Sequence, residues 1–201
     1  MGYCTAWCRT KQDKIYHDTE WGQPVHDDRK QFEYLMLEVM QCGLSWQLIL
    51  KKREVLRRCF HQFDFNKIAA YTPQDIVRIL QEPQMIHSPR KIKAVIQNAQ
   101  AFLEIRRQFG TFSTFLWEFC GNKTILYNGH AAGKVPAANG LSVRLSQTLK
   151  KCGFVFLGPV TLYSHLQACG IINDHSNDCP LLRQINTRYP TIKKKGDQEV
   201  F

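Results

Sequence analysis

Apolar residues recur every three to four positions along most of the chain, which is the spacing of one face of an α-helix. The same period predicts helices over residues 29–41, 45–59, 64–70, 73–81, 89–107 and 111–120, and again from about residue 141. In 29–41 the apolar face consists of Phe32, Leu35, Met36, Val39 and Met40. No alternating apolar run bounded by turn residues indicates a strand, so the sequence predicts an all-α fold.

Two segments interrupt the helical pattern. Residues 122–139 contain Gly, Pro and Asn residues and are predicted to form a loop. Residues 181–201 are polar and basic, and they are predicted to be a disordered tail that follows one helical unit of two packed lobes over 1–180. Neither a signal peptide nor a membrane span is indicated, so we expect a cytoplasmic protein, with a monomer as the default state.

The chain is strongly basic, with 27 Lys and Arg against 17 Asp and Glu and a formal net charge of +10. This balance favours an anionic partner such as nucleic acid. Basic residues cluster at Lys51-Lys52-Arg53, Arg57-Arg58, Arg90-Lys91 with Lys93, and Lys150-Lys151. Each cluster is compatible with a phosphate-binding surface or with an ordinary solvated helix face.

Glu38 is the only charged residue between Tyr34 and Leu50, and Trp46 follows in the same apolar run. A buried carboxylate without a partner is costly or has a shifted pKa. On the helical period, however, Glu38 lies off the apolar stripe. Two interpretations follow, a solvated surface glutamate or a carboxylate that is held for a ligand.

Residues 145–170 predict two helices joined by a tight turn. Gly153 and Gly158 bracket the turn, and Pro159 begins the second helix. Free backbone amides near Gly158, beside the charges of Lys150 and Lys151, would bind a phosphate group. The alternative is a helical hairpin whose glycines only permit a sharp turn. The phosphate-binding interpretation resembles the helix-hairpin-helix motif of DNA repair proteins.

Candidate metal ligands lie near both ends of the chain. A structural zinc site takes four nitrogen or sulfur donors at about 2.0 to 2.3 Å, and two from each end would complete such a site. Scattered Cys and His residues without a metal are the alternative. The candidates are Cys4, Cys8 and His17 near one end, and Asp174, His175 and Cys179 near the other.

Three runs, in this order, resemble the 3-methyladenine DNA glycosylase I family: YHDTEWG at 16–22, LEVMQCGLSW at 37–46, and KKCGFVFLGPVTLYSHLQACGIINDHSNDC at 150–179. The resemblance implies an all-helical helix-hairpin-helix glycosylase fold. It also implies a structural zinc ion that joins the two ends of the chain. The implied ligands are Cys4, His17, His175 and Cys179, with Cys8 as an alternative to Cys4.

The resemblance implies a base-binding site as well. The residues that it assigns to the extruded base are Glu38 and Tyr16 for hydrogen bonding, Trp46 for stacking and Trp21 in the aromatic lining. The loop with Gly43 and Leu44 is expected to enter the duplex. The absence of a lysine near these motifs indicates a monofunctional, hydrolytic glycosylase that forms no Schiff base.

The expected reaction is hydrolytic excision of 3-methyladenine from double-stranded DNA, which leaves an abasic site. Two alternatives are a zinc-stabilised helix-hairpin-helix protein that binds DNA without catalysis, and a glycosylase for another alkylated purine.

Overall fold

The structure is a computed structural model, and it describes residues 3–194. The chain divides into two compact units. Unit 1 consists of Met1–Val25, Leu116–Ser146 and Gly158–Phe201, and unit 2 of His26–Phe115 and Gln147–Leu157. Among the described residues, no helix is long and apolar enough to cross a membrane.

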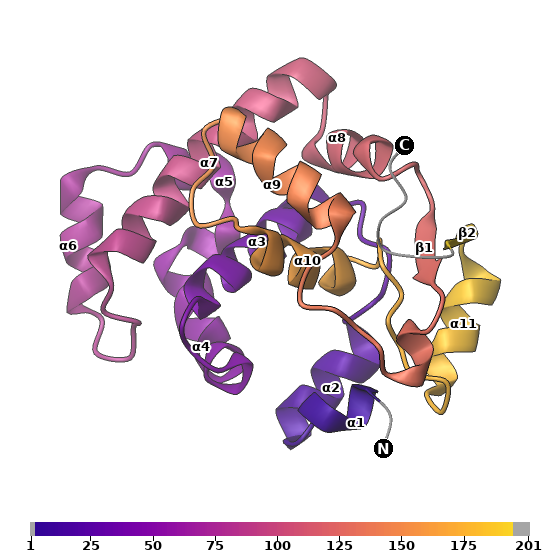
Figure 1. Ribbon diagram of the computed structural model, residues 1–201. Helices are drawn as coiled ribbons and strands as arrows, with labels where there is room; N and C mark the ends of the chain where they lie inside the picture. Colours follow the sequence, from indigo (N-terminus) through magenta and orange to yellow (C-terminus); the bar gives the residue numbers. More distant parts are fainter. Residues whose placement is uncertain (1–2, 195–201) are drawn as a thin grey trace. The chain divides into compact units, whose positions relative to one another are not determined.

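Unit 2 is helical and is built around one long helix, α7 (Figure 1). Its elements are α3 (Asp28–Gln41), α4 (Trp46–Cys59), a 3-10 turn (His61–Phe63), α5 (Phe65–Ala69), α6 (Pro73–Gln81) and α7 (Pro89–Phe109), with the start of α8 (Phe112–Phe119) and the end of α9 (Gly140–Lys151). Helices α3, α5 and α6 all contact α7. At the centre, the ring of Phe102 lies 5.1 Å from Phe32, 4.9 Å from Phe65 and 4.3 Å from Phe112.

Helix starts in unit 2 follow from local sequence. Thr72 and Asp75 form a capping box at the start of α6, where Pro73 is the first helical residue. Ser45 caps α4 by accepting a hydrogen bond from the Leu48 amide at 3.3 Å. The predicted helices of this unit agree with the observed bounds to within two residues.

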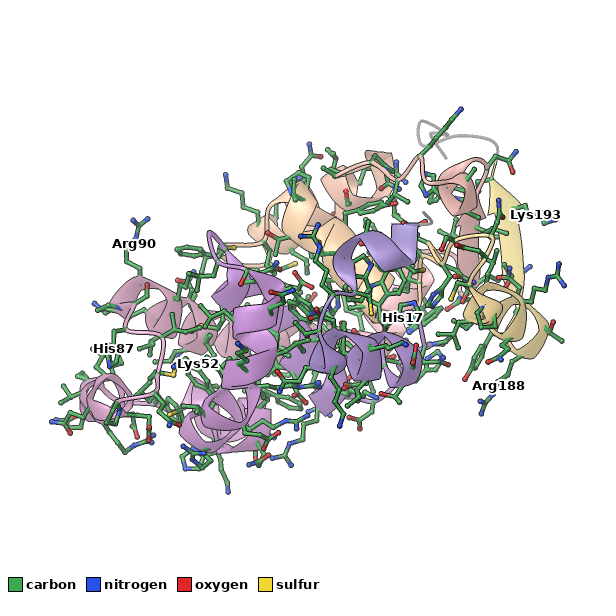
Figure 2. All side chains as sticks on the ribbon, turned by 90° about the horizontal axis from the view of Figure 1, so that it is seen from below. His17, Lys52, His87, Arg90, Arg188 and Lys193 are labelled. Atoms are coloured by element: carbon green, nitrogen blue, oxygen red, sulfur yellow. The ribbon has the colours of Figure 1, made fainter. Side chains whose placement is uncertain are left out.

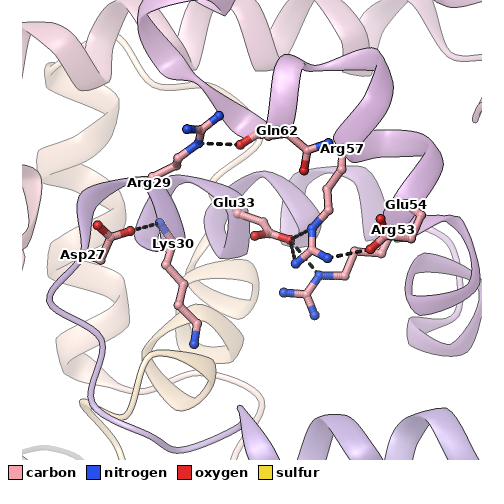
Figure 3. A network of polar contacts seen from close by, with 8 residues as sticks. All are labelled: Asp27, Arg29, Lys30, Glu33, Arg53, Glu54, Arg57 and Gln62. Carbon is pink, nitrogen blue, oxygen red and sulfur yellow. Dashed lines mark hydrogen bonds and ion pairs between the residues drawn. The ribbon is translucent and has the colours of Figure 1, made fainter.

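Ion pairs join α3 to α4 (Figure 3). One carboxylate oxygen of Glu33 accepts hydrogen bonds from Nε of Arg53 at 2.7 Å and from Nε of Arg57 at 2.8 Å. The guanidinium of the buried Arg53 also lies 5.7 Å from the centre of the Tyr34 ring. Because charge-assisted bonds at a partly buried site are directional, this group fixes the position of α4 along α3.

Unit 1 combines helices with a small parallel sheet. It contains α1 (Tyr3–Trp7), α2 (Lys11–Thr19), the end of α8, a 3-10 turn (His130–Ala132), the start of α9, α10 (Pro159–Ala168) and α11 (Pro180–Arg188). Strand β1 (Thr124–Tyr127) pairs with β2 (Thr191–Lys194), with Thr124 opposite Thr191 (Figure 1). On the other side of β1, Ile125 pairs with Ile172.

The strands correct two predictions. The fold is mainly helical rather than all-α, since the predicted loop over 122–139 contains β1. The segment predicted to be a disordered tail contains α11 and β2, while residues 195–201 lie outside the described part. Ile125 donates to the carbonyl of Ile171 at 2.7 Å and accepts from the amide of Asn173 at 2.9 Å. Partners distant in sequence therefore stabilise β1, and no local pattern reveals them.

Candidate active site and metal centre

Glu38 lies on α3 and only 6% of its surface is exposed. Removal from water raises the pKa of its carboxyl group to about 8. Within the described part of the chain, no side chain forms a hydrogen bond or ion pair with this group. Helix α3 also buries residues outside the predicted stripe, including Gln31, Tyr34 and Leu37, so the helical period misplaced Glu38. The solvated interpretation is wrong, and the carboxyl group is suited to a ligand that supplies donors or positive charge.

The loop after α3 leads directly to Trp46. Cys42 ends the helix, Gly43 has a φ of +78°, and Ser45 caps α4, whose first residue is Trp46. A Cβ atom at Gly43 would meet nothing within 4 Å, so its backbone conformation alone favours glycine. Gly43 is exposed, whereas Leu44 and Trp46 are half-buried. Unit 2 thus places an exposed loop and an aromatic ring shortly after a buried carboxyl group.

Lys91 on α7 reaches this loop from the interior of unit 2. Its ammonium group donates to the carbonyls of Met40 at 2.7 Å and Cys42 at 2.6 Å, and the residue is only 9% exposed. Neither alternative given for the basic clusters, a phosphate-binding surface or a solvated helix face, applies to Lys91 and Arg53, because both are buried. The neighbouring Arg90 extends away from α7 into solvent (Figure 2). The fold also brings Lys91 to the motif at 37–46, which itself contains no lysine, but two carbonyls engage its ammonium group.

The turn after α9 is hydrogen-bonded to α7. The side chain of the fully buried Asn98 donates to the Val155 carbonyl at 3.1 Å and accepts from the Val155 amide at 2.8 Å. Both backbone groups of Val155 are thus paired with α7 rather than with water. The residues predicted to contact DNA backbone, Lys150, Lys151, Gly153 and Gly158, are all exposed.

Tyr16 and Trp21 belong to unit 1 and are both buried. Trp7, which the sequence interpretation did not assign, is half-buried and packs edge-on against them, with ring centres 6.3 Å from Tyr16 and 5.3 Å from Trp21. The signal available in the sequence was an aromatic residue between two candidate metal ligands. Tyr16 and Trp21 therefore lie in one aromatic cluster of unit 1, and Glu38 and Trp46 lie in unit 2.

Cys4, His17, His175 and Cys179 come together in unit 1, and all four are buried. Cys4 Sγ lies 3.7 Å from His175 Nδ1, and Cys179 Sγ lies 3.5 Å from the same atom and 3.7 Å from His17 Nε2. In a tetrahedral zinc site, bonds of about 2.3 Å to sulfur and 2.0 Å to nitrogen put neighbouring donors about 3.6 Å apart. The four side chains therefore fit a tetrahedral metal ion. Cys8 is not part of this group.

The electrostatics of the cluster also fit a cation. Burial disfavours the Cys4 thiolate, but hydrogen bonds from His17, His175 and Ser176 outweigh this effect and lower its pKa. Burial and the negative charge of Cys4 raise the pKa of Cys179. The protein alone therefore stabilises one thiolate, and a bound metal ion would stabilise the second.

Gly22, the last residue of the motif YHDTEWG, lies close to the side chain of His175. A Cβ atom at this position would lie 2.7 Å from Nε2 of His175, and its φ of +79° also disfavours other residues. The chain can therefore pass the His175 ring only with glycine at this position. Trp21 packs edge-on against the same ring, with ring centres 4.6 Å apart, so both Trp21 and Gly22 lie against a residue of the four-residue cluster.

Comparison with known proteins decides the family. The family model described as methyladenine glycosylase matches residues 7–183. The chain belongs to the methyladenine glycosylase family. The DNA-3-methyladenine glycosylase of Haemophilus influenzae is 44% identical over 165 residues, which cover 82% of this chain and 89% of that protein. DNA-3-methyladenine glycosylase 1 of Escherichia coli is 43% identical over 164 residues, covering 82% and 88%.

A solved structure supports the same assignment. 3-Methyladenine DNA glycosylase I from Staphylococcus aureus, studied for its recognition of 3-methyladenine, matches with a TM-score of 0.83 and 38% identity. The match covers 89% of this chain and 95% of that one. This member of the methyladenine glycosylase family therefore shares a fold, and not only short motifs, with solved 3-methyladenine glycosylases.

Proposed function

We propose that this protein hydrolyses the N-glycosidic bond of 3-methyladenine in alkylated double-stranded DNA and leaves an abasic site. The observation that carries the proposal is the buried carboxyl group of Glu38, without a partner among the described residues, on the helix that leads to Trp46. A DNA-binding protein without catalysis would gain nothing from a carboxyl group held in this costly state. Relatives named DNA-3-methyladenine glycosylase support the choice of base.

The chemistry requires little from the protein. Methylation at N3 makes adenine electron-poor, so the bond between the sugar C1′ atom and the base breaks with its electron pair moving to the base. Water then adds to C1′ and loses a proton. Glu38 ionises when the electron-poor base binds, accepts a hydrogen bond from the exocyclic amine, and stabilises the positive charge that develops as the bond breaks.

Aromatic side chains select the same base. Trp46 stacks against the electron-poor ring, because an aromatic face attracts positive charge. Tyr16 supplies a second polar contact and Trp21 an aromatic lining. For Tyr16 and Trp21 the support is the family resemblance and their burial in one cluster of unit 1.

We further propose that Cys4, His17, His175 and Cys179 hold a structural zinc ion. The support is their donor set and the spacing of their ligand atoms. When bound, zinc fastens the N-terminal and C-terminal segments of unit 1 and takes no part in the reaction. The presence of Cys4 rather than Cys8 in the cluster favours Cys4 as the ligand.

The contact with DNA involves two exposed segments. The turn between α9 and α10 would act as a helix-hairpin-helix motif, in which the backbone at Gly153 and Gly158 and the charges of Lys150 and Lys151 bind phosphate groups. The loop at Gly43 and Leu44 would enter the duplex and fill the space of the extruded base. A monomeric state remains a prediction.

The proposal is tested with DNA methylated by an N3-directed alkylating agent, followed by chromatography of the released bases. We expect wild-type protein to release 3-methyladenine, Glu38→Gln to lose this release, and the exposed control Glu118→Gln to retain it. Release of a different alkylated purine would show that this purine, and not 3-methyladenine, is the substrate. Absence of any released base, with normal DNA binding, would favour the non-catalytic alternative.

A further inference from the structure

Lys91 is a buried cation that has no part in the function proposed above. Its ammonium group lies between the last turn of α3 and the loop that follows, and it bonds to the carbonyls of Met40 and Cys42. Among the described residues, no carboxylate forms an ion pair with it. Burial of a charge without a counter-ion is costly, so the two carbonyls must be the reason for this lysine.

The C-terminal end of α3 suits a cation. The last carbonyls of a helix have no partner within the helix and carry partial negative charge. An ammonium group has three donors, which allows it to bond two carbonyls that converge from different peptide units. Lys91 thus connects the last turn of the helix to the first residue outside it, and in doing so fixes the direction in which the chain leaves α3.

Other hydrogen bonds of the loop lead back to α3. The Leu44 amide donates to the Gln41 carbonyl at 2.6 Å, the Cys42 amide donates to the Val39 carbonyl at 3.3 Å, and the Cys42 thiol donates to the Glu38 carbonyl at 3.6 Å. The opposite side of Gly43 is open, since a methyl group added there would meet no atom within 4 Å. The conformation of Cys42, Gly43 and Leu44 therefore depends on contacts from the interior, of which Lys91 makes two.

We propose that Lys91 is a positioning residue for entry of the 42–44 loop into DNA. It holds the loop in the shape that enters the duplex, and so assists extrusion of the damaged nucleotide without contributing to binding of the base itself. This inference rests on the proposed function and adds a step to it. The expected signature is a loss of excision from duplex DNA while affinity for the free base is retained.

The test compares Lys91→Met with Lys67→Met, which removes an exposed lysine of the same unit. Two quantities are measured for each protein: single-turnover excision of 3-methyladenine from duplex DNA, and binding of free 3-methyladenine by tryptophan fluorescence. We expect excision by Lys91→Met to fall about tenfold to a hundredfold, the usual effect of a small misplacement of a group. Binding of the free base by Lys91→Met should match the wild type. Lys67→Met should match the wild type in both excision and free-base binding.

A substrate in which the damaged base is opposite an abasic position adds a sharper measurement. Extrusion costs less when the base is unpaired, so the defect of Lys91→Met should shrink on this substrate. Gly43→Ala should likewise reduce excision from duplex DNA while binding of the free base is retained. The φ of this residue is strained for alanine, and the added methyl group makes no new contact.

Each outcome decides the inference. Wild-type excision by Lys91→Met or Gly43→Ala, an equal loss on both substrates, or loss of free-base binding in Lys91→Met would overturn it, the last by showing a general role in folding. Failure of wild-type protein to release any base would instead reject the proposed function, independently of the variants.

Discussion

Nδ1 of His17 lies 2.7 Å from a carboxylate oxygen of Asp18, while Nε2 of the same ring faces Cys179. The carboxylate holds the proton on Nδ1, so Nε2, which donates to the Cys4 thiolate in the metal-free protein, can offer its lone pair to a bound metal ion. Carboxylates in this position orient metal-binding histidines and increase their basicity.

Asp18→Asn is therefore expected to weaken zinc binding by about tenfold to a hundredfold, with the fold retained. Competition with a chromogenic zinc chelator measures the change. Glu118→Gln, an exposed carboxylate of the same unit, serves as the matched control and should bind zinc like the wild type. Equal affinities for Asp18→Asn and wild type would mean that the His17 tautomer does not depend on Asp18.

Removal of the metal should destabilise unit 1. We expect about one equivalent of zinc in protein purified without added metal, and a lower melting temperature after chelation, since metal binding contributes directly to folding free energy. Protein that stays folded after chelation should still excise the base. Cys179→Ser should abolish zinc binding and Cys8→Ser should not, because only Cys179 belongs to the cluster. An unchanged melting curve after complete zinc removal would exclude a structural role.

The raised pKa of Glu38 makes stability depend on pH. Below about pH 4.5 the group is protonated in both folded and unfolded protein, but between this value and about pH 8 only the unfolded state ionises, so stability falls as the pH rises. Glu38→Gln has no carboxyl group at this position, so it does not lose this stability as the pH rises. Its free energy of unfolding should exceed that of wild type by up to roughly 5 kcal/mol above pH 8, with the difference vanishing near pH 4. Denaturant unfolding across this range measures it, and a difference that does not vary with pH would contradict the assignment.

The two bonds between Asn98 and Val155 predict an effect on DNA binding. Asn98→Ala leaves the amide and carbonyl of Val155 without their partner, which should cost about 1 to 3 kcal/mol of stability. The hairpin turn should also loosen and bind DNA less tightly. Binding to unmodified duplex, measured by fluorescence anisotropy, should weaken more than for Gln108→Ala, an exposed glutamine of the same helix. Equal affinities for these two variants would show that the turn does not depend on Asn98.

Local features of the sequence predicted the helices of unit 2 well, because the apolar period and caps such as Thr72 act within a few residues, but α1, α2 and α11 of unit 1 were not predicted. The strands were missed, since β1 is stabilised by segments more than forty residues away in the chain, at Ile172 and in β2. For the metal cluster, the residues alone left scattered Cys and His as an alternative, and the family resemblance selected the four ligands. These ligands come from both ends of the chain, and no short pair of ligands marks the cluster.

The site residues also differ in how far local sequence could predict them. Glu38 was noticed as an isolated charge, but its burial depends on how other elements pack around α3, among them α4 and α7, which a helical period cannot show. Lys91 was grouped with possible surface charges because it follows Arg90 in the sequence, and only the fold shows that Arg90 is exposed while Lys91 is buried. Trp7 was missed because the five-residue helix that carries it has too few positions to display a period.

Lys91 and Asn98 are two turns apart on α7, and one holds the loop after α3 while the other holds the turn after α9. Seven residues of helix span about 10.5 Å and return to nearly the same face. Insertion of one residue between them would rotate one anchor by about 100° relative to the other. The length of this stretch is therefore under stronger constraint than its exposed side chains, and family members should differ there by substitution rather than by insertion or deletion.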